Sequence, residues 1–219
     1  REPDIVSTYD NDTKTYLSGI GLTQASFQTE MQQAYNDMIK SVNRNKGFYV
    51  ARYEMSLDAS KNAQSKKNVT STDASQADTN KWYGLYNKAK NFALKTDTSK
   101  SVVSSMIWGS QYDAMMNWMH QDSNVNVNST TPVAGAVRNQ DEQKRTGFVE
   151  TDKIKNVYDL LGNNYEWTLE VRDFDARVDR GGYSYTSYSP AERSLSLPNY
   201  GANSEYSDFV YLNYSSTRL

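Results

Sequence analysis

The stretch Ile154–Gly182 constrains the fold of this chain more than any other. It contains a turn signal at 162–164 (Gly-Asn-Asn), an alternating run at 165–171 and a second short run at 177–178, and it ends in Arg180-Gly181-Gly182. We interpret the alternating run as the central strand of the domain. The terminal glycine pair allows a close backbone approach or a positive φ, so we expect it to belong to the scaffold.

Large apolar residues occupy one side of the expected strand, and polar residues occupy the other. The apolar side holds Trp167, Leu169 and Val171, and the polar side holds Glu166, Thr168 and Glu170. This alternation predicts a half-buried strand, with Trp167 in the core. A glutamate buried beside a core tryptophan would need hydrogen-bond donors or a metal ion.

The order of residues in this stretch resembles a known family signature. N-V-Y-D-L-L-G-N-N-Y-E-W-T-L-E followed by R-V-D-R-G-G is similar to the formylglycine-generating-enzyme pattern, N-x-x-D-x-x-G-N-x-x-E-W and then R-V-x-R-G-G. Within that family the chain most resembles the variable proteins of diversity-generating retroelements, notably those of gut phages. The resemblance covers about residues 46–219 and implies an elaborated C-type lectin fold.

The other periodic segments agree with an α+β class, in which a small twisted antiparallel sheet is flanked by helices and long loops. Apolar residues recur at three and four from Phe27 to Val42, which predicts a helix with Thr23 as its N-cap and its end before Gly47. Two further helices are expected, one after Thr79 and one around Met115–Met119. Their aromatic and methionine stripes, which include Trp82 and Trp118, are interpreted as core.

The remaining segments are expected to be less regular. Residues 47–54 read as an early strand, whereas 58–79 and 121–150 are long polar stretches that we place on the surface. We therefore expect two parts. Residues 1–46 form an N-terminal lead-in, loosely packed as far as Gly21, followed by a helix packed on the domain. Residues 47–219 form the lectin-like domain. Arg1 is not a natural start, which suggests a processed product or a fragment of a larger chain or virion.

Composition excludes several kinds of partner and chemistry. The 24 basic and 26 acidic residues nearly cancel, so neither nucleic acid nor an anionic membrane is expected as a partner. No apolar run approaches the ~18 residues of a membrane helix, so membrane insertion is not expected. Cysteine is absent and His120 is the single histidine. The redox cysteines and the histidine-rich iron site of the enzymatic branches are therefore missing, and we expect no enzyme, no cofactor and no catalytic metal. Whether calcium binds near Gly162–Trp167, as the resemblance allows, stays open.

The tyrosine-rich segment, residues 183–208, differs from the rest of the chain. Its 26 positions hold five Tyr, seven Ser, two Asn and one Asp, a composition similar to that of antibody paratopes. Few of its residues could anchor a core. We interpret 191–193 (Ala-Glu-Arg) as a buried frame and expect a closing strand at Phe209–Leu212. The candidate ligand-binding residues, expected to lie exposed on one face, are Tyr183, Tyr185, Tyr188, Asn199, Tyr200, Asn203, Ser204, Tyr206 and Asp208.

Three functions are compatible with this sequence. The resemblance implies a ligand-binding protein whose segment is rewritten by adenine-directed mutagenesis, displayed on a virion or cell surface and directed at a variable protein or glycan on a cell. Asn codons then become Tyr, Ser and Asp, which is the bias of residues 183–208. The alternatives are a structural decoration domain and, less in keeping with the missing reagents, an enzyme using paired carboxylates such as Glu166 and Glu170.

Overall fold

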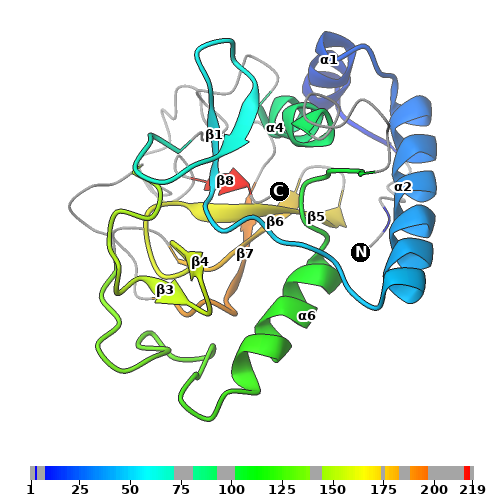
Figure 1. Ribbon diagram of the computed structural model, residues 1–219. Coiled ribbons are helices and arrows are strands. Elements are labelled where there is room, and N and C mark those ends of the chain that lie inside the picture. Colours follow the sequence, from blue (N-terminus) through cyan, green and yellow to red (C-terminus); the bar gives the residue numbers. More distant parts are fainter. Residues whose placement is uncertain are drawn as a thin grey trace.

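The computed structural model describes residues 3, 8–71, 81–92, 102–138, 145–173, 176–182, 188–196 and 215–217. In these residues the fold is mixed α+β, as the sequence predicts. A four-stranded sheet of order β7-β6-β5-β8 lies at the centre, with two small antiparallel hairpins and the helices around it (Figure 1).

The central sheet contains β5 (Tyr165–Asp173), β6 (Ala176–Arg180), β7 (Arg193–Ser196) and β8 (Ser215–Thr217). Strands β5, β6 and β7 are antiparallel neighbours. Strand β8 pairs with β5 in parallel, so the sheet is not wholly antiparallel. The expected closing strand at 209–212 lies outside the described residues.

Two helices begin the chain. Helix α1 (Asn11–Gly19) is capped by the Asp10 side chain, which accepts from the Thr13 amide. Helix α2 (Gln24–Asn45) starts at the predicted cap, where Thr23 and Ser26 form a capping box. In Figure 1, α2 lies along one edge of the molecule.

Residues 1–21 were expected to be a loosely packed lead-in, and for the described residues this is wrong. Leu17 of α1 is fully buried, as is Tyr9 just before the helix. Most residues of α1 are short and polar, and two side chains of the helix are buried. Two buried positions are too few to give a helical periodicity that can be recognised in the sequence.

Helices α4 (Lys81–Lys90) and α6 (Gly109–His120) confirm the other two helical predictions. Trp82 and the methionines of α6 are buried, as expected. Trp118 is instead half-exposed, and the Lys155 ammonium lies 4.7 Å from its ring centroid. The expected N-cap Thr79 lies outside the described residues.

The first strand is displaced from its predicted position. Residues 47–54 are irregular, and β1 (Met55–Leu57) begins after them and pairs with β2 (Ala63–Ser65). The aromatic run at 47–54 is held by single contacts, such as the bond from the Tyr158 amide to the Arg52 carbonyl, and Tyr49 is fully exposed. Strand β2 lies inside the stretch 58–79, which was expected to be a loop.

The second hairpin joins β3 (Lys153–Ile154) to β4 (Val157–Tyr158). The polar stretch before it is also less superficial than expected, because Val125, Val127 and Thr146 are buried. Residues 139–144 of that stretch are not among the described residues.

Strand β5 is buried on both faces, not on one. Trp167 and Leu169 pack with α1, α2 and α4 in one apolar cluster, and Trp167 is fully buried as predicted. The polar face is covered as well, and Glu166, Thr168 and Glu170 are all buried. The prediction of a half-buried strand is therefore wrong. Alternation shows which side chains are polar, but it does not show whether other parts of the protein cover them, as they do here.

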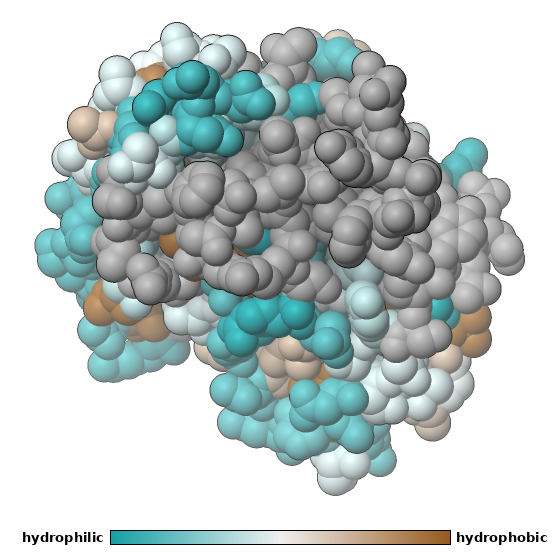
Figure 2. Space-filling view, turned by 180° about the vertical axis from the view of Figure 1, so that it is seen from behind, coloured by the Kyte–Doolittle hydropathy of each residue, from teal (hydrophilic) through white to brown (hydrophobic). Residues whose placement is uncertain are grey.

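A second apolar cluster lies around α6. It joins the α6 methionines to Ile107, Val125, Val127 and the β3–β4 hairpin. No described helix has the length and apolar character needed to span a membrane. On the face shown in Figure 2, hydrophilic side chains predominate among the described residues, and hydrophobic ones form small separate patches.

Candidate functional site

Of the predicted ligand-binding residues, the structure describes Tyr188 alone. Tyr188 is 40% exposed, and its part in ligand binding stays a prediction. Its ring centroid lies 6.0 Å from that of Tyr165, which is buried at the start of β5. The other eight (Tyr183, Tyr185, Asn199, Tyr200, Asn203, Ser204, Tyr206 and Asp208) lie outside the described residues, so their common face stays a prediction.

The tyrosine-rich segment begins in the connection between two paired strands. Arg180, at the end of β6, is the pairing partner of Arg193, at the start of β7. The Gly181 amide donates to the Glu192 carbonyl at 3.1 Å, which extends the ladder one step into the connection. Residues 181–182 and 188–193 are thus the two described ends of this connection, and we call them its first and second foot.

The glycine pair permits a close approach at the first foot. Gly181 has a φ of 75°, in the left-handed region that glycine enters without strain. A Cβ on Gly182 would lie 2.7 Å from the Leu161 carbonyl oxygen and 3.2 Å from that of Tyr188. The expectation that these glycines belong to the scaffold is confirmed.

The second foot is held by neighbouring elements. The Tyr112 hydroxyl, from α6, donates to the Pro190 carbonyl at 2.9 Å, and the Ala191 amide donates to the Val127 carbonyl at 3.0 Å. A turn follows, in which the Glu192 amide donates to the Ser189 carbonyl. Ser189 and Pro190 are buried by these contacts, whereas Tyr188 beside them remains exposed.

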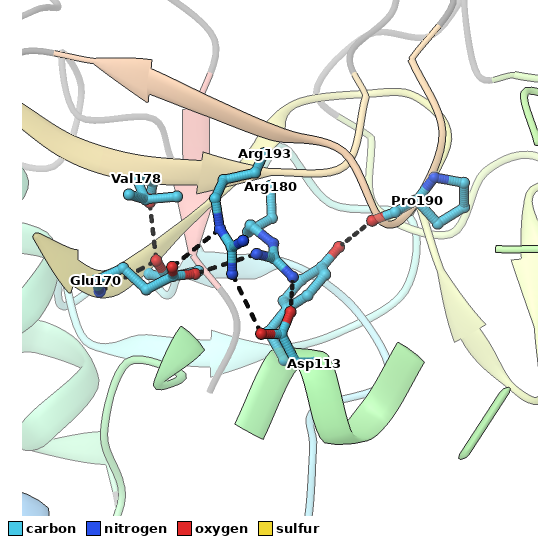
Figure 3. Close-up of polar contacts among 8 residues, drawn as sticks. Asp113, Glu170, Val178, Arg180, Pro190 and Arg193 are labelled. Atoms are coloured by element: carbon cyan, nitrogen blue, oxygen red, sulfur yellow. Dashed lines mark hydrogen bonds and ion pairs between the residues drawn. The ribbon is translucent and has the colours of Figure 1, made fainter. Parts of the chain in front are cut away.

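Four charged side chains form a closed ring at the second foot, which contributes Arg193 to it (Figure 3). Each of the two arginines pairs with both carboxylates, and the members of this charge ring are Asp113, Glu170, Arg180 and Arg193. The Arg193 Nε lies 3.0 Å from Glu170 and its Nη2 lies 3.2 Å from Asp113. Arg180 lies 3.2 Å from Glu170 and also pairs with Asp113. The ring joins α6, β5, β6 and β7 and has no net charge.

Burial differs strongly within the charge ring. The side chains of Arg180 and Glu170 are 2% and 11% exposed, whereas those of Asp113 and Arg193 are 49% and 48% exposed. Buried charges are tolerated where opposite charges and hydrogen bonds satisfy them, which the two inner members provide for each other. The outer pair contacts solvent, so its attraction is open to screening by salt.

Glu170 also contacts the beginning of α6. Its side chain lies so close to Gly109, the first residue of the helix, that a Cβ at position 109 would overlap the carboxylate group. A carboxylate at a helix N-terminus is favoured by the helix dipole. Glycine at 109 therefore makes room for the acid that the ring needs.

The segment 191–193 was expected to be a buried frame, and this is wrong. Ala191 is half-buried, while Glu192 and Arg193 are exposed. These residues contribute backbone bonds, the packing of Ala191 against the second apolar cluster and the ionic contacts of Arg193, which together fix the second foot. Tyr112 and Asp113 were not predicted as site residues, because they lie in α6 just before the methionine stripe that was interpreted as core.

The family-like motif at Gly162–Trp167 is filled by polar contacts from β1 and its neighbourhood. The buried Glu54 carboxylate accepts from the side chain of Asn163 and, at 3.2 Å, from the Asn164 amide. The Asn164 side chain donates to the Ser71 hydroxyl at 2.6 Å. Within the part of the chain that the structure describes, no group of three or more His, Asp or Glu side chains is arranged to hold a metal ion.

Compared with protein-family models, with curated proteins and with solved structures, the chain gives no significant match to any of the three.

Proposed function

We propose that this protein is a ligand-binding module of C-type lectin type, in which the tyrosine-rich segment binds a variable protein or glycan on a cell surface. The module acts at a virion or cell surface and catalyses no reaction. The lectin-type fold and the retroelement origin both come from the resemblance of residues 154–182 to the family signature.

One observation carries the proposal: an exposed tyrosine lies in the second foot, whose backbone is held by neighbouring elements. Tyr188 is exposed, while its neighbours Ser189 and Pro190 are buried, and the Pro190 carbonyl accepts from Tyr112 of α6. Side chains on such a segment can change without disturbing the core, because main-chain atoms and the charge ring make the anchoring contacts. Tyrosine provides a large contact area at a small entropic cost, which suits a binding surface.

The test is loss of binding without loss of fold. Labelled protein is applied to a panel of intact bacterial cells and to a glycan array. The triple variant Tyr183→Ser, Tyr185→Ser, Tyr188→Ser should lose at least about tenfold in binding signal, because aromatic anchors dominate such interfaces. Its free energy of unfolding should change little, since exposed substitutions stay within about 0.5 kcal/mol each.

Tyr49→Ser provides the matched control, because Tyr49 is fully exposed and lies outside the segment. It should bind as the parent does. Retained binding by the triple variant, or its unfolding, would refute the proposal. If the parent itself binds neither cells nor glycans, a decoration domain becomes the better description.

A further inference from the structure

We propose that the charge ring is a positioning device, which holds the second foot of the tyrosine-rich segment, residues 188–193, in one place relative to the sheet. The inference rests on the proposed function, in that it assigns to Asp113, Glu170, Arg180 and Arg193 the task of presenting Tyr188 and its neighbours.

The topology makes Arg193 the controlling member. It is the first residue of β7, and it pairs with Arg180, the last residue of β6. Its guanidinium reaches Glu170 of β5 and Asp113 of α6 with two different nitrogens. A planar fork of this kind fixes direction as well as distance, which a single ammonium group cannot do.

The backbone hydrogen bonds near Arg193 define the segment that the charge ring holds in place. The Gly181, Ala191 and Glu192 amides all donate to backbone carbonyls within or beside the second foot. The Tyr112 hydroxyl adds a bond to Pro190 from the residue next to Asp113 on α6. Two adjacent residues of one helix thus hold the foot at two points, one by a neutral hydrogen bond and the other by charge (Figure 3).

The ring is suited to positioning more than to global stability. Half of it is exposed, and exposed ion pairs contribute little to the free energy of unfolding. Its inner carboxylate, by contrast, is buried between β5 and the start of α6, so the outer arginine is attached to an immobile point. Loss of Arg193 should therefore release the foot locally and leave the core intact.

Amide hydrogen exchange measured by NMR tests this without any ligand. In Arg193→Gln, the Gly181, Ala191 and Glu192 amides should exchange at least about tenfold faster, because local opening becomes easier. The Leu169 amide, which donates to the Ile107 carbonyl in the core, should keep its rate within about twofold. Arg193→Lys should restore part of the protection, since one ammonium can serve one carboxylate but not both.

Arg145→Gln is the matched control, because Arg145 is also exposed and bonds to Asn68, outside the segment. It should leave all three amides unchanged. In the parent, ~1 M NaCl should accelerate the same three amides by screening the outer pair, and it should have little further effect in Arg193→Gln.

Two results would overturn the inference: unchanged exchange of the three amides in Arg193→Gln, or equal acceleration of Leu169, which would mean a general loss of stability. Neither depends on the ligand, so failure of the charge ring leaves the binding proposal standing. Conversely, normal binding by the tyrosine triple variant refutes the proposed function even if the exchange results are as expected.

Discussion

Buried polar side chains carry much of the specificity of this fold at the scale of single residues. Arg177 is buried with its guanidinium 4.3 Å from the Trp82 ring centroid and 3.2 Å from the Tyr83 hydroxyl oxygen. Thr168 donates to the Val178 carbonyl, and its own carbonyl accepts from the Trp82 indole. Each of these groups has a partner on another element, so misplacing one element would leave a buried polar group unsatisfied.

Gly109 offers a direct test of the charge ring's inner end. A methyl group at this position would overlap the Glu170 side chain and push the carboxylate away from Arg180 and Arg193. We expect Gly109→Ala to lower the free energy of unfolding by about 1–3 kcal/mol, as overpacking does. Urea denaturation provides the measurement.

Gly47→Ala is the paired control, since a Cβ there meets no atom within 4 Å. Its effect should stay within about 0.5 kcal/mol. Equal effects of the two substitutions would contradict the close contact between Glu170 and the start of α6.

Single residues also show which features of the site could be predicted from the sequence. The exposure of Tyr188 and the burial of Trp167 follow from local composition and alternation, and both were predicted. The roles of Asp113 and Arg193 were not, because the two lie 80 positions apart in the chain. A carboxylate next to the apolar residues of α6 is the one sequence signal that could have indicated Asp113.

Helix α2 shows at the element scale how local signals fix a boundary. Its Thr23–Ser26 capping box places the start, and at the other end Lys46 adopts a left-handed conformation with a φ of 60°. The Lys46 amide donates to the Val42 carbonyl at 2.8 Å, which closes the last turn. A non-glycine residue there is strained, because its Cβ crowds the backbone.

Lys46→Gly should therefore stabilise the protein by about 0.5–1 kcal/mol. The same substitution at Lys40, which is exposed inside α2, should destabilise by about 1 kcal/mol through the low helix propensity of glycine. Thermal unfolding of both variants checks the opposite signs. A Lys46→Gly variant that melts below the parent would contradict the left-handed cap.

Elements with a strong period were predictable, and those defined by long-range pairing were not. The stripes of α2, α4 and α6 lie in contiguous sequence, so periodicity alone reveals them. Strand β1 and its partner β2 have three residues each. Such short strands carry no readable alternation, and β1 is extended by a bridge between Ser56 and Ser71, which lies 15 residues further along the chain. Parallel pairing of β8 with β5 is likewise a tertiary feature.

At the scale of the whole molecule, β5 separates two apolar clusters. One contains Leu17 and Trp167 with the N-terminal helices, and the other contains Met119 with the 121–138 loop and the β3–β4 hairpin. Consecutive residues connect them, since Trp108 belongs to the first cluster and Ile107 to the second. The N-terminal helices therefore complete the core around the sheet, which also supports the tyrosine-rich segment.

The two clusters should unfold together, because each covers one face of the same strand. We expect Leu17→Ala and Met119→Ala, both at fully buried positions, to cost about 2–5 kcal/mol each. In both variants, tryptophan fluorescence and far-ultraviolet circular dichroism should report one transition at the same urea concentration. Loss of the first cluster would uncover Trp167 and Leu169 of β5, and loss of the second would displace α6, which carries Asp113 of the charge ring, so neither half has a stable structure alone. Separate transitions in Leu17→Ala, with the α6 methionine cluster persisting after the N-terminal helices have melted, would show that residues 8–45 are an appendage and not part of the core.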